Sequence, residues 1–127
     1  MRVDRAMQPL LLQDLVTIRG AAGQQIVQSA TSWLDLGELE DITIFTDVRE
    51  VSAGVTMKIE TAAVAHDAAF VQLVPSFTLA TGLRTDVIPA SLANVPPARF
   101  IRWNLSVAPG ATGDATFRIW IAGYGWA

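Results

Sequence analysis

Residues 41–62, with the sequence DITIFTDVREVSAGVTMKIETA, decide the fold class of this 127-residue chain. Apolar and polar side chains alternate over residues 42–48 and again over residues 55–60, which is the period of a β-strand that buries one face. The side chains assigned to the buried faces are Ile42, Ile44, Thr46 and Val48 in the first half and Val55, Met57 and Ile59 in the second. Small residues and Gly54 lie between the halves, and glycine adopts the positive φ of a tight turn without strain. The simplest interpretation is an antiparallel hairpin with one buried face.

Short strands separated by turns are predicted along the rest of the chain as well. The predicted strands outside residues 41–62 are residues 16–19, 25–29, 33–36, 70–79, 99–107 and 117–121. Pro75 predicts a bend or a sheet edge in one of them, because proline cannot donate a hydrogen bond to a neighbouring strand. Residues 81–97 contain three prolines and are predicted to be a turn-rich connection. We expect the last two strands to pair as a hairpin across a turn at residues 109–114.

This succession of short strands, with almost no helical periodicity, predicts an all-β fold. We expect residues 14–127 to form a single-domain antiparallel β-sandwich of about eight strands in a jelly-roll-like arrangement. A chain of this length buries about two-thirds of its unfolded surface, so its core needs no disulfide or metal. Residues 1–13 have the least regular pattern. We expect a short N-terminal arm there, and a short helix starting at Pro9 fits the same residues.

The apolar stripes of the predicted strands indicate which residues form the core. Residues 101–107 have the clearest alternation, with Trp103 on the apolar stripe and Arg102 on the opposite face. Phe117 lies on the apolar stripe of the last strand. The expected core residues are Ile44, Val48, Met57, Ile59, Trp103, Leu105, Phe117 and Ile119.

Composition excludes several classes of protein. The absence of cysteine excludes disulfide frameworks, zinc–thiolate clusters and thiol nucleophiles. A formal net charge of -3 argues against binding to nucleic acid or to an anionic membrane. Hydrophobic residues make up 51% of the chain, which is high for a small monomer, so we expect part of the surface to be buried against protein partners. Residues 1–12 lack the pattern of a secretory signal, and no segment has the length and apolar character of a membrane span.

Few residues have a pattern that is typical of catalysis or metal binding. His66 is the only histidine, it lies in a predicted loop, and the chain has no Gly-x-Ser-x-Gly motif. Glycoside hydrolysis needs a pair of carboxylates, and the pairs offered by Asp47, Glu50 and Glu60 have no specific spacing. One acidic group could supply oxygen ligands to calcium but lacks EF-hand spacing and is expected to be a solvated turn. Its members are Asp35, Glu38, Glu40 and Asp41. We therefore predict no enzyme activity, no cofactor and no metal.

Aromatic and arginine side chains away from the core stripes are the candidate binding residues. Arginine outnumbers lysine eight to one, and it forms planar, bidentate pairs with carboxylates at protein interfaces. Exposed aromatic rings on a β-sandwich serve protein interfaces or stack on sugars, and Trp120, Tyr124 and Trp126 are the candidates for sugar stacking. The candidate interface residues are Leu10, Leu11, Leu12, Phe45, Phe70, Arg84, Arg102, Arg118, Trp120, Tyr124 and Trp126.

Three segments of the chain resemble a known family. Residues 33–36 (WLDL), 41–51 (DITIFTDVREV) and 54–62 (GVTMKIETA) are similar to small β-sandwich virion proteins encoded among the head genes of tailed bacteriophages, in particular head decoration (cement) proteins. The shared pattern is one of strands without catalytic residues, so no functional residue is carried over. The resemblance implies a non-enzymatic protein on the outside of an icosahedral capsid, commonly a trimer, that clamps neighbouring capsomers.

We therefore expect a structural virion protein, namely a capsid decoration protein that binds and stabilises the outer surface of a tailed-phage head. The expected partners are further copies of the chain, with a trimer favoured by the resemblance, and the major capsid protein. Neither nucleic acid nor a membrane is an expected partner. The expected location is the capsid surface, after synthesis in the host cytoplasm. The alternatives are another virion component, such as a head fibre base, a tail-associated protein or a minor capsid protein, and a carbohydrate-binding β-sandwich module.

Overall fold

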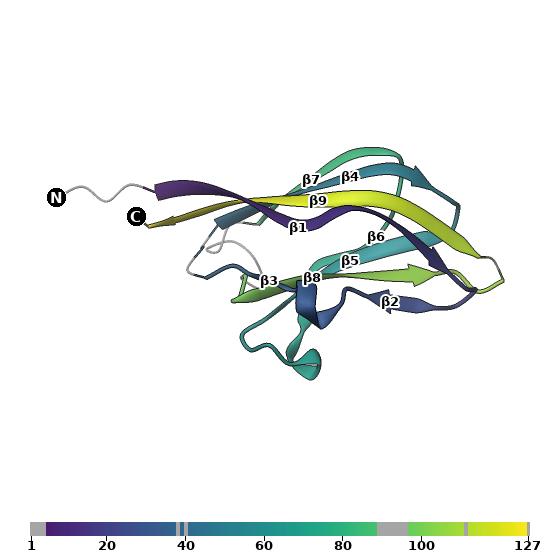
Figure 1. The fold of residues 1–127 in the computed structure, drawn as a ribbon, viewed down its shortest axis with the longest axis horizontal. Helices are drawn as coiled ribbons and strands as arrows, with labels where there is room; N and C mark the ends of the chain where they lie inside the picture. Colours follow the sequence, from purple (N-terminus) through teal and green to yellow (C-terminus); the bar gives the residue numbers. More distant parts are fainter. Residues whose placement is uncertain (1–4, 38, 40, 89–96, 111, 127) are drawn as a thin grey trace.

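The computed structural model describes residues 5–37, 39, 41–88, 97–110 and 112–126. Within these residues the chain forms nine strands and two short 3₁₀ turns (Figure 1). The strands are β1 (Arg5–Gly20), β2 (Gln25–Val27), β3 (Leu34–Asp35), β4 (Asp41–Val51), β5 (Val55–Ala62), β6 (Val71–Thr78), β7 (Gly82–Ile88), β8 (Phe100–Val107) and β9 (Gly113–Trp126). The turns are η1 (Ala30–Ser32) and η2 (Asp67–Ala69).

The strands form two antiparallel sheets that face each other, which confirms the predicted β-sandwich. The first sheet has the order β1-β9-β4-β7, and the second has the order β2-β8-β5-β6 with the short β3 also paired to β8. Pairing is nested around the connection between β5 and β6: β5 pairs with β6, β4 with β7, β2 with β8, and β1 with β9. This nesting, in which the first strand pairs with the last, is the arrangement of a jelly roll.

The predicted hairpin over residues 41–62 is wrong about which strands pair, but the prediction of which side of each strand is buried is confirmed. β4 lies in the first sheet and β5 in the second, so the two strands face each other across the core. The seven side chains assigned to the buried faces are all buried. Gly54 has the expected positive φ, at 84°. Alternation specifies which side of a strand is buried, and both a hairpin and a turn between facing sheets satisfy that requirement.

Two further predictions are corrected, one about strand pairing and one about a missing strand. The last two strands, β8 and β9, lie in different sheets, so they do not form a hairpin across residues 109–114. Residues 81–97 were predicted to be a connection, but Gly82–Ile88 forms the edge strand β7. Residues 89–96 lie outside the described part of the chain. The prediction for Pro75 is confirmed, because β6 is an edge strand with two register shifts.

The N-terminal segment forms a paired strand rather than the expected arm. From Arg5 onward it belongs to β1, which pairs with β9 from Arg5 opposite Trp126 to Gly20 opposite Gly113. Irregularities in register occur between Leu11 and Val16. The start of β1 and the end of β9 lie side by side at one end of the molecule and reach beyond the other strands (Figure 1). Residues 1–4 lie outside the described part.

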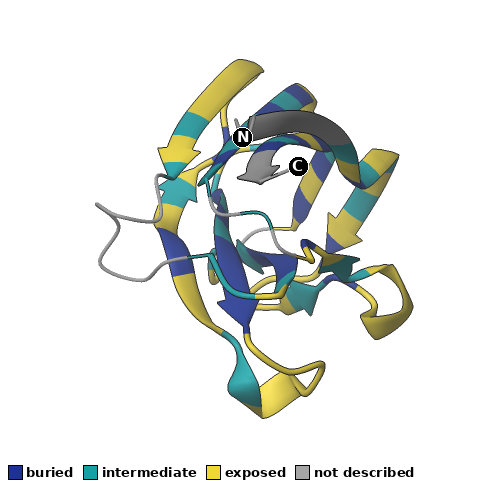
Figure 2. Cartoon of the chain, turned by 90° about the vertical axis from the view of Figure 1, so that its left-hand side faces the viewer, coloured by how far each residue is buried: buried dark blue, intermediate teal, exposed yellow. Residues whose placement is uncertain are grey.

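The predicted core is confirmed, because all eight expected residues are at most 3% exposed. Trp103 and Phe117 come from opposite sheets and meet edge to face, with ring centroids 5.4 Å apart. The indole Nε1 of Trp103 donates a hydrogen bond to Gln13 Oε1 at 3.0 Å, which satisfies its polar atom at the rim of the core. Buried positions concentrate in the central strands, whereas the outer strands and loops are largely exposed (Figure 2).

Candidate interaction surface

Three apolar side chains form a row across the outer face of the first sheet. Leu11 in β1 lies opposite Trp120 in β9, and Trp120 lies opposite Phe45 in β4. Paired residues of an antiparallel sheet project to the same face, so these side chains are neighbours. Leu11 is 46% exposed, Trp120 is 37% exposed and Phe45 is partly buried. We call these three residues the outer row.

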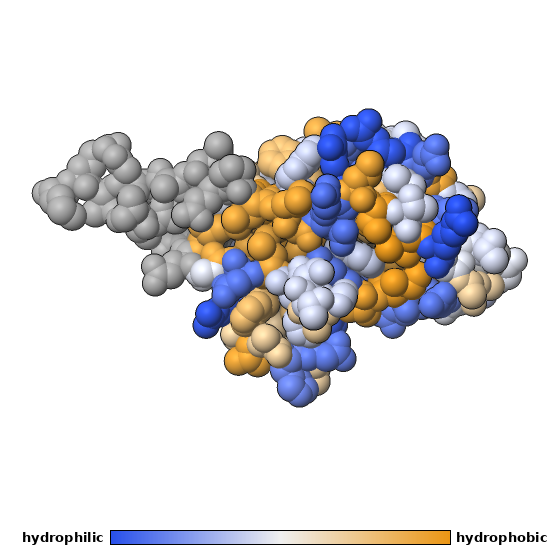
Figure 3. Space-filling model, in the orientation of Figure 1, coloured by the Kyte–Doolittle hydropathy of each residue, from blue (hydrophilic) through white to orange (hydrophobic). Residues whose placement is uncertain are grey.

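Exposed apolar side chains concentrate in the strands of the first sheet. Among the described residues, seven large apolar side chains are exposed, and five of them lie in β1, β7 and β9. These five are Leu11, Leu15, Leu83, Val87 and Trp120. Figure 3 shows apolar side chains gathered over and beside β1, interrupted by a few hydrophilic ones. An apolar patch of this kind on a small protein typically marks a binding surface.

Charged side chains flank the outer row. Asp47 Oδ2 accepts hydrogen bonds from Arg118 Nε at 3.0 Å and from Arg49 Nε at 3.1 Å. The guanidinium carbon of Arg118 lies 4.2 Å from the centroid of the Trp120 ring. The guanidinium group therefore occupies one face of this ring, which leaves less of the indole free to stack on a sugar.

Arg84 lies on the inner side of β7 and contacts the facing sheet. Its guanidinium carbon lies 3.8 Å from the ring centroid of Phe77 in β6. It also forms two hydrogen bonds to Asp86, from Nε to Oδ2 at 2.9 Å and from Nη2 to Oδ1 at 3.1 Å. Arg84 and Asp86 therefore form a planar, bidentate ion pair at the edge of the first sheet.

The outer face of the second sheet holds a buried ion pair. Arg102 in β8 and Glu60 in β5 lie opposite each other and are 5% and 7% exposed. Arg102 Nε donates to Glu60 Oε1 at 2.9 Å, and Arg102 Nη1 donates to Asp67 Oδ1 at 2.6 Å. Asn104 Nδ2 donates to the same Glu60 oxygen at 3.2 Å. These hydrogen bonds compensate for the removal of both charges from water.

Two aromatic rings cover this ion pair from the outside. The ring centroids of Phe70 and Trp33 lie 4.0 Å and 5.2 Å from the guanidinium carbon of Arg102. The two rings contact each other with their centroids 4.7 Å apart. Trp33 and Phe70 each follow a 3₁₀ turn, so the segments after β2 and after β5 meet over the sheet. We call these residues the Arg102 cluster: Trp33, Glu60, Asp67, Phe70, Arg102 and Asn104.

The structure separates the candidate interface residues into three groups. Leu12 and Arg102 are buried at 3% and 5% exposure, so neither offers a surface to a partner, and Phe70 covers Arg102. Tyr124 and Trp126 lie in β9, and their side chains are outside the described part of the structure. Leu10 is partly buried and packs against the core. The candidates with exposed or partly exposed side chains away from the core are Leu11, Phe45, Arg84, Arg118 and Trp120.

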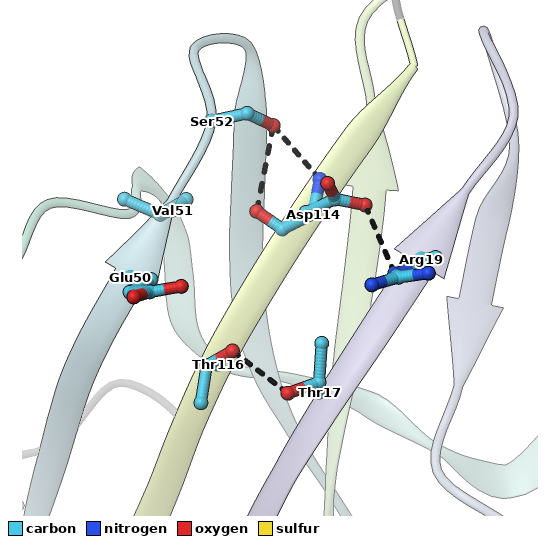
Figure 4. Close-up of a pocket in the computed structure, with 7 residues that line it drawn as sticks. All are labelled: Thr17, Arg19, Glu50, Val51, Ser52, Asp114 and Thr116. Atoms are coloured by element: carbon cyan, nitrogen blue, oxygen red, sulfur yellow. Dashed lines mark hydrogen bonds and ion pairs between the residues drawn. The ribbon is translucent and has the colours of Figure 1, made fainter.

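A hollow of about 280 Å³ lies at one end of the first sheet (Figure 4). Hydrogen bonds join several of its polar groups: Thr17 Oγ1 and Thr116 Oγ1 are 2.8 Å apart, and Ser52 Oγ accepts from the Asp114 backbone N–H at 2.8 Å. Arg19 Nε lies 3.9 Å from Asp114 Oδ1. The lining residues come from the end of β1, the end of β4 with the adjoining Ser52, and the start of β9.

The titratable residues considered for chemistry are dispersed over the molecule. His66 is exposed, and its Nδ1 accepts a hydrogen bond from the backbone N–H of Ala68 at 3.2 Å. Asp47 lies on the outer face of the first sheet and Glu60 on that of the second, so these carboxylates do not form a pair. Within the described residues no three histidine or acidic side chains are placed to hold a metal ion. No helix in the same part of the chain has the length and apolar character to cross a membrane.

Asp35, one of the acidic residues considered for calcium, is paired with an arginine. Arg99 donates from Nε at 3.2 Å and from Nη2 at 3.1 Å to Asp35 Oδ2, and the Gly37 backbone N–H donates to Oδ1 at 2.8 Å. The hydrogen bonds from Arg99, followed by that from Gly37, lower the pKa of Asp35. Glu38 and Glu40 lie outside the described residues.

A pH dependence follows from the lowered pKa of Asp35. Because the folded-state pKa lies below the unfolded value of about 3.9, the pair stabilises the fold above that pH and loses its effect as the pH falls through the folded-state pKa. Asp35→Asn is therefore expected to lower the urea midpoint at pH 7, and to lower it by less as the pH falls below about 3.9. A loss that does not change with pH would contradict this assignment.

Comparison with known proteins relates the chain to others by fold. No protein-family model and no curated protein matches the sequence. Similar solved structures include the infectious bursal disease virus VP2 subviral particle, with a TM-score of 0.57 and 10% identity over 94% of this chain. A structure of the Gx strain of the same virus has a TM-score of 0.55 and 12% identity over 93% of this chain. The chain spans 32% of the length of each of these proteins, so it shares its fold with one part of a virus particle protein.

Proposed function

We propose that this chain is a non-enzymatic structural protein of a virus particle, and more specifically a decoration (cement) protein that binds and stabilises the outer surface of a tailed-phage head. The observation that carries the proposal is the outer row, an apolar strip on the outer face of a jelly-roll sheet. The fold shared with a virus particle protein supports it, and so does the sequence resemblance to head decoration proteins.

The outer row has the composition of a protein interface. Trp and Arg are enriched among the residues that contribute most to binding, and Trp120 lies beside Arg118 here. Asp47 holds Arg118 and Arg49 in place, so the charged rim is ordered before a partner arrives. A preorganised surface loses less side-chain entropy on binding than a flexible one.

The proposed partners are the major capsid protein and further copies of the chain, with a trimer favoured by the resemblance. The termini are proposed to add to this contact, because β1 and β9 end side by side at one end of the molecule (Figure 1). An extended segment at such an end adds backbone hydrogen bonds to a neighbour's sheet edge. The proposed location is the capsid surface, after synthesis in the host cytoplasm.

A capsid-retention assay tests the role of the outer row. Leu11→Glu is expected to weaken retention on cognate phage heads at least tenfold. A loss of about 1.4 kcal/mol of binding free energy reduces affinity tenfold, and burying a charged side chain in an apolar contact costs more than that. The melting temperature of the variant should stay close to that of the wild type, because Leu11 is 46% exposed. Val64→Glu is the matched control, because Val64 is 57% exposed in the segment after β5.

Three outcomes of this assay bear on the proposal. Equal retention of Leu11→Glu and Val64→Glu would reject the outer row as the contact. Retention on phage tails in place of heads would show that the protein is a virion component other than a head decoration protein. Deleting residues 1–4 tests the terminal contact without removing any part of β1, whereas deleting residues 1–12 would also remove the buried Leu12. Undiminished retention of the shorter deletion would remove the terminus from the proposed contact.

A further inference from the structure

Three of the four sheet edges carry features that discourage pairing with another strand. Natural proteins protect sheet edges with short strands, prolines and bulges. The β1 edge contains Pro9 and irregular register, and the β6 edge contains Pro75 and two register shifts. The edge formed by β2 and β3 consists of strands of three and two residues. Each of these edges is therefore a poor template for a further strand.

The fourth edge, β7, has no proline and no bulge, and its two inward-facing charged residues, Arg84 and Asp86, are paired with each other. Its seven residues, GLRTDVI, contain neither proline nor lysine, and they pair with β4 from Val48 opposite Gly82 to Ile42 opposite Ile88 without a register shift. Within the described residues no strand pairs with the other side of β7. In a strand with one neighbour, alternate residues direct their backbone N–H and C=O groups to the open side. Leu83 and Val87 are 63% and 67% exposed, the two highest values among the exposed large apolar side chains.

The sequence of β7 is complementary to itself when read in the opposite direction. Centred on Thr85, a second antiparallel copy would place Leu83 opposite Val87 of the second copy and Arg84 opposite Asp86 of the second copy. Two-fold symmetry repeats each pair, which gives two apolar contacts on one face and two ion pairs on the other. In a parallel, in-register arrangement Arg84 would face Arg84, which is repulsive. The charge pattern therefore selects the antiparallel register.

We propose that β7 is a homotypic pairing edge, through which two copies of the chain join their first sheets about a two-fold axis at Thr85. The joined sheet has the order β1-β9-β4-β7 in one copy followed by β7-β4-β9-β1 in the other. The pairing is independent of the proposed virion function, because it rests on the β7 edge and not on the outer row.

The conformation of Arg84 and Asp86 in the single chain favours this pairing. The bidentate hydrogen bonds between them and the stacking of Arg84 on Phe77 hold both side chains on the inner side of β7. A second copy brings an identical pair to the same side, so each carboxylate receives a second guanidinium neighbour. Side chains that are already ordered lose little entropy when the copies join.

A single cysteine tests the position of the two-fold axis, because the chain contains no other cysteine. In Thr85→Cys the two thiols lie opposite each other, with Cβ atoms about 4.5–5.5 Å apart. Treatment with a short bis-maleimide cross-linker at micromolar protein is expected to give a covalent dimer at least about tenfold faster than in Thr78→Cys. Thr78 is an exposed threonine on the β6 edge, and so provides the matched control.

Sedimentation of the cysteine-free chain supplies the second test. We expect a species of twice the 13.7 kDa chain mass, or a hexamer of three such dimers if the proposed trimer contact also forms in solution. Leu83→Lys places a lysine in both symmetric apolar contacts and is expected to raise the dimer Kd at least about tenfold. Val71→Lys, at a position of β6 that is also more than half exposed, should leave the Kd unchanged. Equal cross-linking rates of the two cysteine variants, or an assembly state that Leu83→Lys does not change, would overturn the proposal.

Discussion

Arg102→Met is expected to lower the free energy of unfolding by about 3–5 kcal/mol, because it removes the hydrogen-bonded cation of the buried Glu60 carboxylate and leaves only Lys58, whose Nζ lies 3.7 Å from Glu60 Oε2. Arg102 and Glu60 are 5% and 7% exposed, and Arg102 also holds Asp67 and stacks under Phe70. The single variant therefore loses an ion pair and the contact that fixes the segment after β5. Urea unfolding monitored by tryptophan fluorescence measures the change.

A second variant separates the ion pair from simple loss of packing. The double variant Arg102→Met with Glu60→Met removes both charges together, and apolar replacements of a buried ion pair are commonly close to neutral. We expect the double variant to be more stable than Arg102→Met alone, with the coupling measured as in a double-mutant cycle. If the stability losses of the two single variants add up to that of the double variant, or if Arg102→Met lowers the free energy of unfolding by less than about 1 kcal/mol, then water reaches the ion pair.

Trp103→Ala is expected to cost about 3–5 kcal/mol of unfolding free energy, through the cavity that it leaves between the sheets. Trp103 is 3% exposed, contacts Phe117 from the opposite sheet, and donates its indole N–H to Gln13. Small domains have about 5–15 kcal/mol of stability, so the variant should unfold at a markedly lower temperature. Calorimetry or circular dichroism on heating provides the measurement.

Trp120→Ala is the control for the loss of a tryptophan as such. Trp120 is 37% exposed on the outer row, where substitutions usually change stability by less than about 1 kcal/mol. A Trp103→Ala variant as stable as Trp120→Ala would contradict the assignment of Trp103 to the core. Such a result would require the strand face to be shifted by one residue.

The strand faces were predictable from sequence because they depend on local alternation. Ile44, Met57 and Phe117 could be assigned to the core from period-two patterns alone, and each is fully buried. The alternation failed for β7, where Leu83 and Val87 point outward and the charged Arg84 lies on the inner side at the sheet edge. An edge strand with apolar residues outside has no buried stripe to detect.

The sequence allowed individual candidate binding residues to be chosen, but not which of them lie next to each other in the folded protein. Phe45 and Trp120 could be chosen because they lie off the core stripes, and Leu11 because an apolar N-terminal segment needs a surface to lie on. The adjacency of the three depends on the pairing of β1, β9 and β4. Arg102 was assigned to the surface because it alternates with the core residues of β8. Trp33 and Phe70, from segments far away in sequence, cover it in the folded chain.

The sequence by itself determined the fold class and the inward side of most strands, since both follow from interactions within a few residues. Only the tertiary structure decided which strand pairs with which. A turn such as that at Gly54 is compatible with a hairpin within one sheet and with a crossing between two sheets. The crossing is favoured because it turns the apolar faces of β4 and β5 toward each other, while their backbone groups pair with strands distant in sequence. The balance between burying these apolar faces and pairing the backbone groups depends on the whole chain. It determines the positions of the outer row, the Arg102 cluster and the β7 edge.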